Sequence, residues 1–369
     1  MHRGIAHLPL HYGKAPAWLF QRMTAMAREI TLVVIAEFGP EEVLVRLSDP
    51  FWFQAFGCVL GFDWHSSGLT TTVCGALKEG LKGLEKDTGL VVAGGKGRVS
   101  RNTPREIENY CDRVSLNAAP LTYASRMTAK VDSSGVQDGY QIYHHTFVFT
   151  HKGDWCVVQQ GMNTATRYAR RYHWMGDHVT DFVCEPHDAI CCDARGDTLN
   201  MVAEESSDAR TAVAALAREH PDRTADEARS VLYLNMPSRH GIGQSDLNLT
   251  RLHKILLTTY EHSPADFEQV LGTPGVGPKT IRALSLIAEL VYGASPSFRD
   301  PARFSFAHGG KDGHPYPVDR DIYDRSIDIL KRSLWAAKVG RTEKLKAMAR
   351  LNDFYRSPGH PNGSLQSGS

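Results

Sequence analysis

The sequence lacks any run of about 18 uninterrupted apolar residues, which a membrane-spanning helix would need. It also lacks an N-terminal export pattern, in which a charged segment precedes an apolar segment and a cleavage site. Its 7 cysteines are odd in number and scattered, which is typical of a reduced protein rather than one built on disulfides. These absences predict a cytoplasmic protein with no membrane partner.

An excess of charge of one sign is absent as well, because 42 Lys and Arg residues balance 41 Asp and Glu residues. The net charge of +1 excludes a globally basic coat protein for nucleic acid, but it permits local basic faces. The hydrophobic fraction of 42% suffices for packed cores and excludes wholesale disorder. The length of 369 residues predicts about two domains.

The residue pattern changes near residue 200, and it predicts an α+β protein. Residues 1–200 mix helical and strand patterns and are expected to form a mixed α/β domain. Within them, strands over 140–149 and 155–160 flank a turn and predict a β-hairpin. Residues 103–106, Thr-Pro-Arg-Glu, match a helix capping box.

Residues 201–357 are expected to form an all-α domain, because every periodic segment beyond residue 204 has helical spacing. The predicted helices cover 206–220, 225–234, 247–261, 265–271, 279–292 and 319–335. Residues 358–369 are rich in Gly and Ser and are expected to form a flexible tail.

The most informative segment is 271–280, Leu-Gly-Thr-Pro-Gly-Val-Gly-Pro-Lys-Thr, which lies between two predicted helices. Gly275 and Gly277 permit a turn too tight for larger side chains, and Val276 between them is expected to pack inward. The N–H groups of such a turn, with Lys279 and Thr280 at the start of the next helix, can bind a phosphate oxygen. The segment resembles the helix-hairpin-helix motif, which grips the DNA backbone without reading its sequence.

Two basic runs are candidates for further DNA contacts, because one hairpin neutralises very few phosphates. Residues 331–350 carry seven basic residues and one acid, beginning with Lys331 and Arg332; the alternative is a solvated helix face. Arg170 and Arg171 lie among tyrosines and a tryptophan, a mixture that suits a nucleic-acid backbone and base stacking. The alternative for this second run is an amphipathic helix.

In the DNA glycosylase branch of helix-hairpin-helix proteins, a Pro-Gly-Val-Gly-x-Lys-Thr string is followed by Val-Asp at the start of a later helix. This sequence is similar, with Lys279 at the Lys position and Asp319 at the Asp position after a longer intervening segment. The resemblance implies that Lys279 attacks the sugar to form a Schiff base and that Asp319 supports this step. Alternatively, Lys279 contacts phosphate and Asp319 caps a helix.

A second candidate site lies in the N-terminal part, where carboxylates and imidazoles are suited to a divalent metal such as Mg or Mn. The candidate ligands are Asp63, His65, Asp132, Asp138 and His145. His144 precedes His145 on a predicted strand, so the two imidazoles are expected on opposite faces. The aromatic-rich run 51–56 is expected in a core, with the surface of a homodimer as the alternative.

Three strings are similar to a prokaryotic family labelled domain of unknown function 763, and the resemblance covers about residues 1–357. They are Arg-Gly-x-Ala-x-Leu-Pro-Leu-His-Tyr-Gly at 3–13, Gly-Cys-Val-Leu-Gly-Phe-Asp-Trp-His-Ser-Ser-Gly at 57–68 and Val-Gln-Gln-Gly-Met-Asn at 158–163. The resemblance implies a distinct N-terminal domain joined to a helix-hairpin-helix region, and a role in DNA cleavage or repair.

Three functions follow from these patterns. The first is a DNA repair enzyme of the glycosylase and abasic-site lyase type, which removes a damaged base, nicks the strand and needs no cofactor. The second is an Mg- or Mn-dependent DNA endonuclease that uses the hairpin only for docking. The third is a DNA-structure-binding protein without catalytic activity.

Overall fold

A five-stranded antiparallel sheet lies at the centre of the computed structural model, which describes residues 15–62, 67–166, 168–192, 194–232, 249–303 and 320–356. Its strand order is β1-β3-β4-β5-β6. The strands are β1 (Leu90–Lys96), β3 (Gln141–Thr150), β4 (Trp155–Asn163), β5 (Tyr168–Met175) and β6 (Ala189–Cys191). A small second sheet pairs β2 (Val136–Gln137) with β7 (Leu199–Asn200). The α+β class is confirmed, and so is the predicted β-hairpin, which is formed by β3 and β4.

The sheet is buried on both faces, because apolar side chains on its strands alternate between two cores. Phe147 and Phe149 of β3 enter one core, whereas Val148 between them enters the other. His144 and His145 alternate in the same way, as expected from their positions on one strand.

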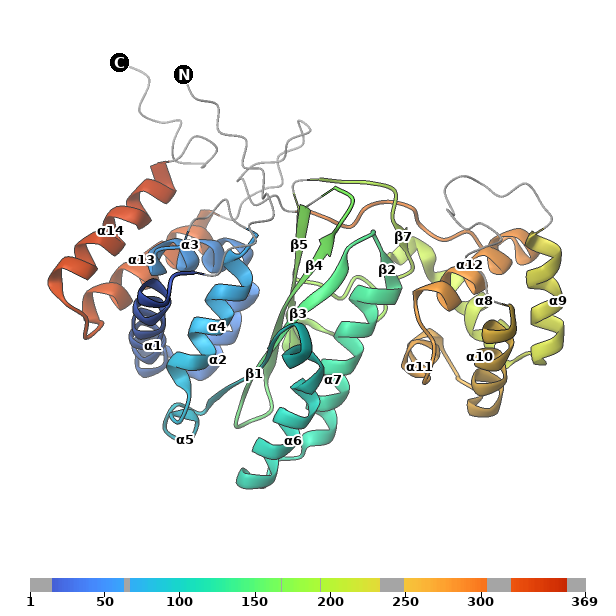
Figure 1. The fold of residues 1–369 in the computed structure, drawn as a ribbon, viewed down its shortest axis with the longest axis horizontal. Coiled ribbons are helices and arrows are strands. Elements are labelled where there is room, and N and C mark those ends of the chain that lie inside the picture. Colours follow the sequence, from blue (N-terminus) through green and yellow to red (C-terminus); the bar gives the residue numbers. More distant parts are fainter. Residues whose placement is uncertain are drawn as a thin grey trace, which may run out of the picture.

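One face of the sheet is covered by helices from the first and last parts of the described chain, drawn in blue and red in Figure 1. They are α1 (Ala17–Phe38), α2 (Pro40–Ser48), α3 (Pro50–Leu60), α4 (Leu69–Leu81), α13 (Arg320–Ala336) and α14 (Arg341–Arg356). The aromatic-rich run lies in α3, where Trp52, Phe53 and Phe56 are buried in this core. Its alternative role as a dimer surface is therefore wrong.

The other face is covered by α6 (Thr103–Val114) and α7 (Ala118–Lys130), beyond which further helices pack. These are α8 (Ser207–Arg218), α9 (Pro221–Leu232), α10 (Leu249–His262), α11 (Phe267–Gly272) and α12 (Pro278–Tyr292). Short helical elements are α5 (Glu85–Thr88), η1 (Gly97–Asn102), η2 (Val131–Gly135), η3 (Gly176–His178) and η4 (Glu204–Ser206).

The predicted division at residue 200 does not match this arrangement. A single apolar core runs from the sheet into α8–α12 and includes Leu199 and Met201, on either side of the expected boundary. The helices α13 and α14 belong to the opposite core, where they pack against α1 and α3 (Figure 1). Apolar spacing shows that a helix has a buried face, but it does not identify the partner of that face. The predicted tail, 358–369, lies outside the described residues.

The capping box predicted at the start of α6 is wrong. The Thr103 hydroxyl donates to the carbonyl oxygen of Ser100 at 2.7 Å, and no side chain caps the helix. Glu106 accepts instead from the backbone N–H of Gly94 at 3.0 Å and from the Lys78 ammonium at 2.6 Å. The carboxylate therefore ties α6 to β1 and α4.

None of the helices in the described ranges is both long and apolar enough to span a membrane.

Candidate nucleic-acid interface and adjoining cleft

The hairpin predicted to bind DNA is formed by α11 and α12. Gly275 has a φ of +87°, which favours glycine, and it is exposed at the turn. Val276 is 2% exposed and belongs to the core beneath, so it anchors the turn as expected. Pro278 begins α12, and its ring occupies a position where a missing N–H costs no helical hydrogen bond.

The first turn of α12 has one side exposed and one side buried. Lys279 is exposed there and Gly277 is partly exposed, whereas Thr280 is only 4% exposed. A direct contact between the Thr280 side chain and DNA is therefore not supported, because that side chain packs inward. The N–H groups at the start of a helix lack intrahelical acceptors, so this turn offers donors to an anion.

The exposure of Lys279 bears on its two predicted roles. A lysine nucleophile is activated by removal of its ammonium group from water, and an exposed position gives no such removal. Contact with a phosphate needs only an accessible charge. Asp319, its predicted partner in the Schiff-base reading, lies outside the described residues.

The hairpin is fastened to the sheet side of the molecule by polar contacts. The Lys130 ammonium, at the end of α7, donates to the carbonyl oxygen of Val276. The Gln137 amide donates to the carbonyl oxygen of Pro278 at 2.8 Å, and it accepts from Arg282 at 2.8 Å. The turn is therefore held in a fixed position relative to α7 and β2.

A cleft of about 780 Å³ adjoins the hairpin and is walled by η1, α7, β3 and the end of α11. Its basic lining residues are Arg101, Arg126 and Lys130, and none of its lining residues is acidic. Tyr123 lines it and is 46% exposed. The full lining is Ser100, Arg101, Pro104, Tyr123, Ser125, Arg126, Met127, Ala129, Lys130, Ser133, Ile142, His145 and Gly272. Cations and an accessible aromatic ring are a combination suited to a nucleic-acid strand.

A chain of hydrogen bonds begins at the floor of this cleft. The Ser125 hydroxyl lies 2.9 Å from Nε2 of His145, and Nδ1 of His145 lies 2.9 Å from Oε1 of Gln159. The Gln159 amide nitrogen donates to Asp132 at 2.5 Å, so its oxygen must accept from Nδ1–H. Nε2 then carries the lone pair and accepts from Ser125. Ser125 and His145 are only 2% and 4% exposed, but unlike Thr280, Arg170 and Arg171 both line the cleft.

Burial determines the protonation states of the titratable groups in this hydrogen-bond chain. It lowers the pKa of His145 to about 4, against an opposing contribution from the hydrogen bond to Gln159. The imidazole is therefore neutral near pH 7. Burial also raises the pKa of Asp132, which the neighbouring His187 and the Trp174 indole counteract. His187 and Trp174 both bond to the Asp132 carboxyl group and fix its orientation.

Gly94 allows β1 to approach β3 closely beside the hydrogen bonds of His145. Its φ is +88°, and a Cβ placed there would lie 2.2 Å from the carbonyl oxygen of His145. A side chain at this position would therefore displace the strand that holds the imidazole.

The predicted metal ligands do not come together in the part of the chain that the structure describes. Asp132 and His145 contact Gln159 from opposite ends, whereas Asp138 accepts from Arg170 at 2.9 Å. No group of three or more His, Cys, Asp or Glu side chains suited to a metal occurs among the described residues. The other two candidates, Asp63 and His65, lie outside them.

Arg170 and Arg171 are wrong as DNA contacts, because both are only 1% exposed. They lie on β5 rather than on a helix, so their side chains enter opposite sides of the sheet. Arg170 binds Asp138 at 2.9 Å and Asp300 at 2.7 Å. The Arg171 guanidinium donates to Gln54 at 3.0 Å. The sequence showed that these residues are charged, but it did not predict the strand in which they are buried.

Lys331 and Arg332 lie on α13, in the layer across the sheet from the hairpin (Figure 1). They therefore do not extend the hairpin surface. At least one basic residue of the run that they begin makes hydrogen bonds within the protein and is not available to DNA. Arg350 donates to the carbonyl oxygens of Cys58 at 3.0 Å and Val59 at 2.6 Å, where it satisfies the end of α3.

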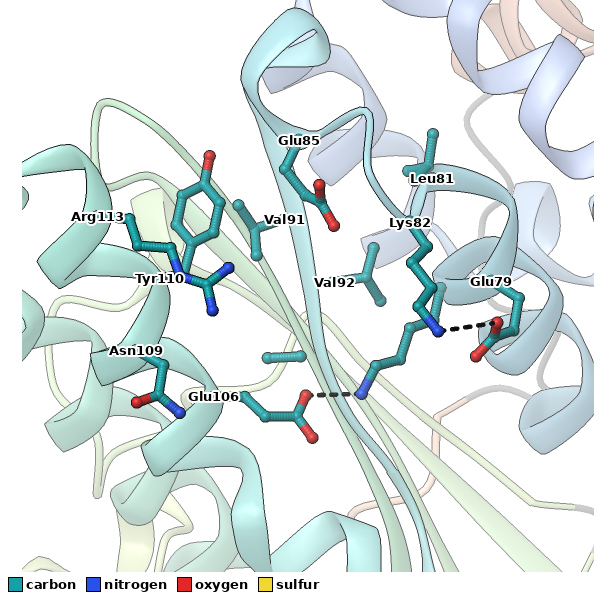
Figure 2. Close-up of a pocket in the computed structure, with 12 residues that line it drawn as sticks. Glu79, Leu81, Lys82, Glu85, Val91, Val92, Glu106, Asn109, Tyr110 and Arg113 are labelled. Carbon is teal, nitrogen blue, oxygen red and sulfur yellow. Dashed lines mark hydrogen bonds and ion pairs between the residues drawn. The ribbon is translucent and has the colours of Figure 1, made fainter.

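A separate hollow of about 300 Å³ lies between α4, β1 and α6 (Figure 2). Lys78 and Glu106 both line it, and they form an ion pair at 2.6 Å. Lys82 and Glu79 form a second pair at 3.8 Å on its rim. Oppositely charged groups thus lie side by side here, unlike the cleft beside the hairpin, whose charged lining residues are all basic.

The comparisons with known proteins agree with the resemblance of the three strings. A family model described as a protein of unknown function, DUF763, matches residues 4–318. The chain belongs to the DUF763 family. No curated protein and no solved structure gave a match. The family assignment does not name a reaction.

Proposed function

We propose that this DUF763 protein binds DNA through the hairpin of α11 and α12 and incises a strand that lies in the adjoining cleft. The observation that carries the proposal is the turn itself. Gly275 is exposed at a positive φ, Val276 is buried beneath it, and Lys279 is exposed beside it. These are the features with which a helix start binds a backbone phosphate.

The surroundings of the turn support the same reading. The cleft begins at Gly272, at the end of α11, and its lining provides Arg101 and Arg126 without any carboxylate. A strand gripped at the turn would therefore meet further positive charge on the side of α7. Because backbone contacts carry no base information, this binding is expected to be independent of sequence.

The binding test uses fluorescence anisotropy of a labelled duplex at several salt concentrations. Lys279→Ala is expected to weaken binding about 3- to 10-fold and to reduce the salt slope by about one, as for one lost phosphate contact. Lys82→Ala is the matched control, since Lys82 is exposed at the end of α4, away from the hairpin. Equal effects of the two substitutions would contradict the docking role.

The incision test uses end-labelled duplexes that carry an abasic site, an oxidised pyrimidine, uracil or no lesion. Each is incubated with Mg or Mn, with EDTA, and with EDTA plus borohydride. A trapped adduct that Lys279→Gln abolishes would establish the lyase reaction proposed for Lys279 and Asp319. Cleavage only with metal would favour the endonuclease. Binding without product on any substrate would leave a DNA-structure-binding protein.

A further inference from the structure

We propose that Ser125 and His145 form a nucleophile and base pair that attacks a DNA phosphodiester bound in the basic cleft. The proposal rests on the proposed function, because the hairpin would deliver the strand to this cleft. It assigns the incision to the floor of the cleft rather than to Lys279.

The geometry of the pair is that of a nucleophile beside its base. Ser125 comes from the middle of α7 and His145 from β3, and their Oγ and Nε2 atoms lie 2.9 Å apart. This is the distance at which a base removes a proton from a hydroxyl nucleophile. Gln159 holds the other ring nitrogen and is itself held by Asp132, so the base is oriented by further groups.

The tautomer of His145 also suits the role of a base. The Gln159 oxygen accepts from Nδ1–H, which leaves the Nε2 lone pair directed at the Ser125 hydroxyl. The neutral imidazole in this tautomer presents a lone pair that can receive the proton, although burial lowers its pKa. An anionic substrate beside it would stabilise the resulting imidazolium.

The charge of the cleft favours an anionic substrate. Arg101, Arg126 and Lys130 line it, whereas the nearby carboxylates stand behind the lining, Glu108 paired with Arg126 at 3.9 Å and Glu268 accepting from the Tyr123 hydroxyl. Developing negative charge on a phosphoryl group is stabilised by such fixed cations. A neutral ester would gain much less from this lining than a phosphodiester does.

The reaction balances without a redox partner. The Ser125 Oγ attacks phosphorus while its proton moves to Nε2 of His145, and the bond from phosphorus to one deoxyribose oxygen breaks. That oxygen takes the proton from His145 and leaves as a hydroxyl end. Water, deprotonated by His145, then attacks the phosphoserine diester, and the Ser125 oxygen leaves and regains a proton. The net products are one phosphate end and one hydroxyl end.

A purely structural hydrogen bond between α7 and β3 is the competing explanation for the pair. Ser133 provides the matched control, because it lines the same cleft but its hydroxyl bonds to Ser134 and to the Lys130 carbonyl rather than to a histidine. A structural role of Ser125 would change stability without any covalent product. Nucleophilic attack leaves a product on Ser125 itself.

The experiment measures cleavage of a labelled duplex and the mass of the protein after reaction with bis(4-nitrophenyl) phosphate. It uses wild type, Ser125→Ala, His145→Gln and Ser133→Ala in the full chain, with DNA affinity and thermal melting measured alongside. We expect a 4-nitrophenyl phosphoryl group on the peptide that contains Ser125. We also expect Ser125→Ala and His145→Gln to lose at least about 100-fold in cleavage, while Ser133→Ala stays within about 2-fold.

Unchanged cleavage by a folded Ser125→Ala variant would overturn the proposal, and so would a wild-type protein that binds DNA but neither cleaves it nor is phosphorylated. Failure of the proposed function has a different signature. In that case, the wild type binds no DNA, whereas the small diester can still label Ser125.

Discussion

His145 is the residue on which most of the site depends. Its imidazole lies in the core that joins the sheet to the hairpin helices, and it contacts a hydroxyl on one side and an amide on the other. A buried imidazole without such partners would cost free energy, because its ring nitrogens would lose water without replacement. The residues around it thus satisfy a polar group and hold its lone pair toward the cleft.

The stability of the protein is expected to depend on pH through this residue. The pKa of His145 is about 4 in the folded protein and 6.5 in its ordinary state, so the unfolded chain binds a proton that the folded chain does not. The free energy of unfolding should therefore fall as pH drops from about 6.5 to about 4, by about 3 kcal/mol from this group.

Urea unfolding at pH 7 and pH 4 measures this loss. His145→Gln should remove the share of the pH dependence that this imidazole contributes. A variant of His145 with the full wild-type pH dependence would assign the loss elsewhere, for example to His144, whose pKa burial lowers to about 3.

Gly94 offers a second test at the residue scale. Gly94→Ala should lower the free energy of unfolding by more than about 3 kcal/mol, because the new Cβ would lie 2.2 Å from the His145 carbonyl oxygen. Gly83→Ala is the matched control, since Gly83 also has a positive φ of +83° but has nothing within 4 Å of the added Cβ. It should cost about 1–2 kcal/mol. Similar losses for both variants would show that φ alone, and not contact with β3, requires Gly94.

At the scale of the elements, the sequence predicted the local structure of helices and strands well, but it predicted poorly which elements pack against one another. The helices α8 to α12 and the hairpin of β3 and β4 follow from spacing, because the period of apolar residues is a local property. The strand β5 was missed, since adjacent arginines among aromatic residues resemble a surface run until their buried partners are known. Ser125 was missed for a related reason: its significance arises only when α7 packs against β3.

The position of α13 yields a prediction about elements. Leu334 is fully buried in the core that α13 shares with α1, so Leu334→Ala should cost about 2–5 kcal/mol. Amide exchange should speed up mainly in α1 and remain slow in α12. The exposed Leu345 on α14 provides the control, and Leu345→Ala should cost less than about 0.5 kcal/mol. If amide exchange in Leu334→Ala sped up in α12 instead, this would support the prediction that α12 and α13 belong to one all-α domain.

At the scale of the whole molecule, the two cores back onto one sheet, and the hairpin and cleft share one of them. A division by sequence position cannot describe this, because α12 belongs to one core and α13, later in the chain, belongs to the other. The hairpin motif could be predicted, since its glycines and proline determine the turn locally. The cleft could not, because its lining comes from four separate segments of the chain.

The helix α7 carries both Ser125, on the cleft floor, and Lys130, whose ammonium holds the hairpin turn. Five residues along a helix span about 7.5 Å, and a helix does not stretch. In the proposed reaction, α7 thus fixes the distance between the phosphate that the hairpin binds and the phosphate that Ser125 attacks. Product ends would then lie at a constant offset from the bound position, whatever bases the strand contains.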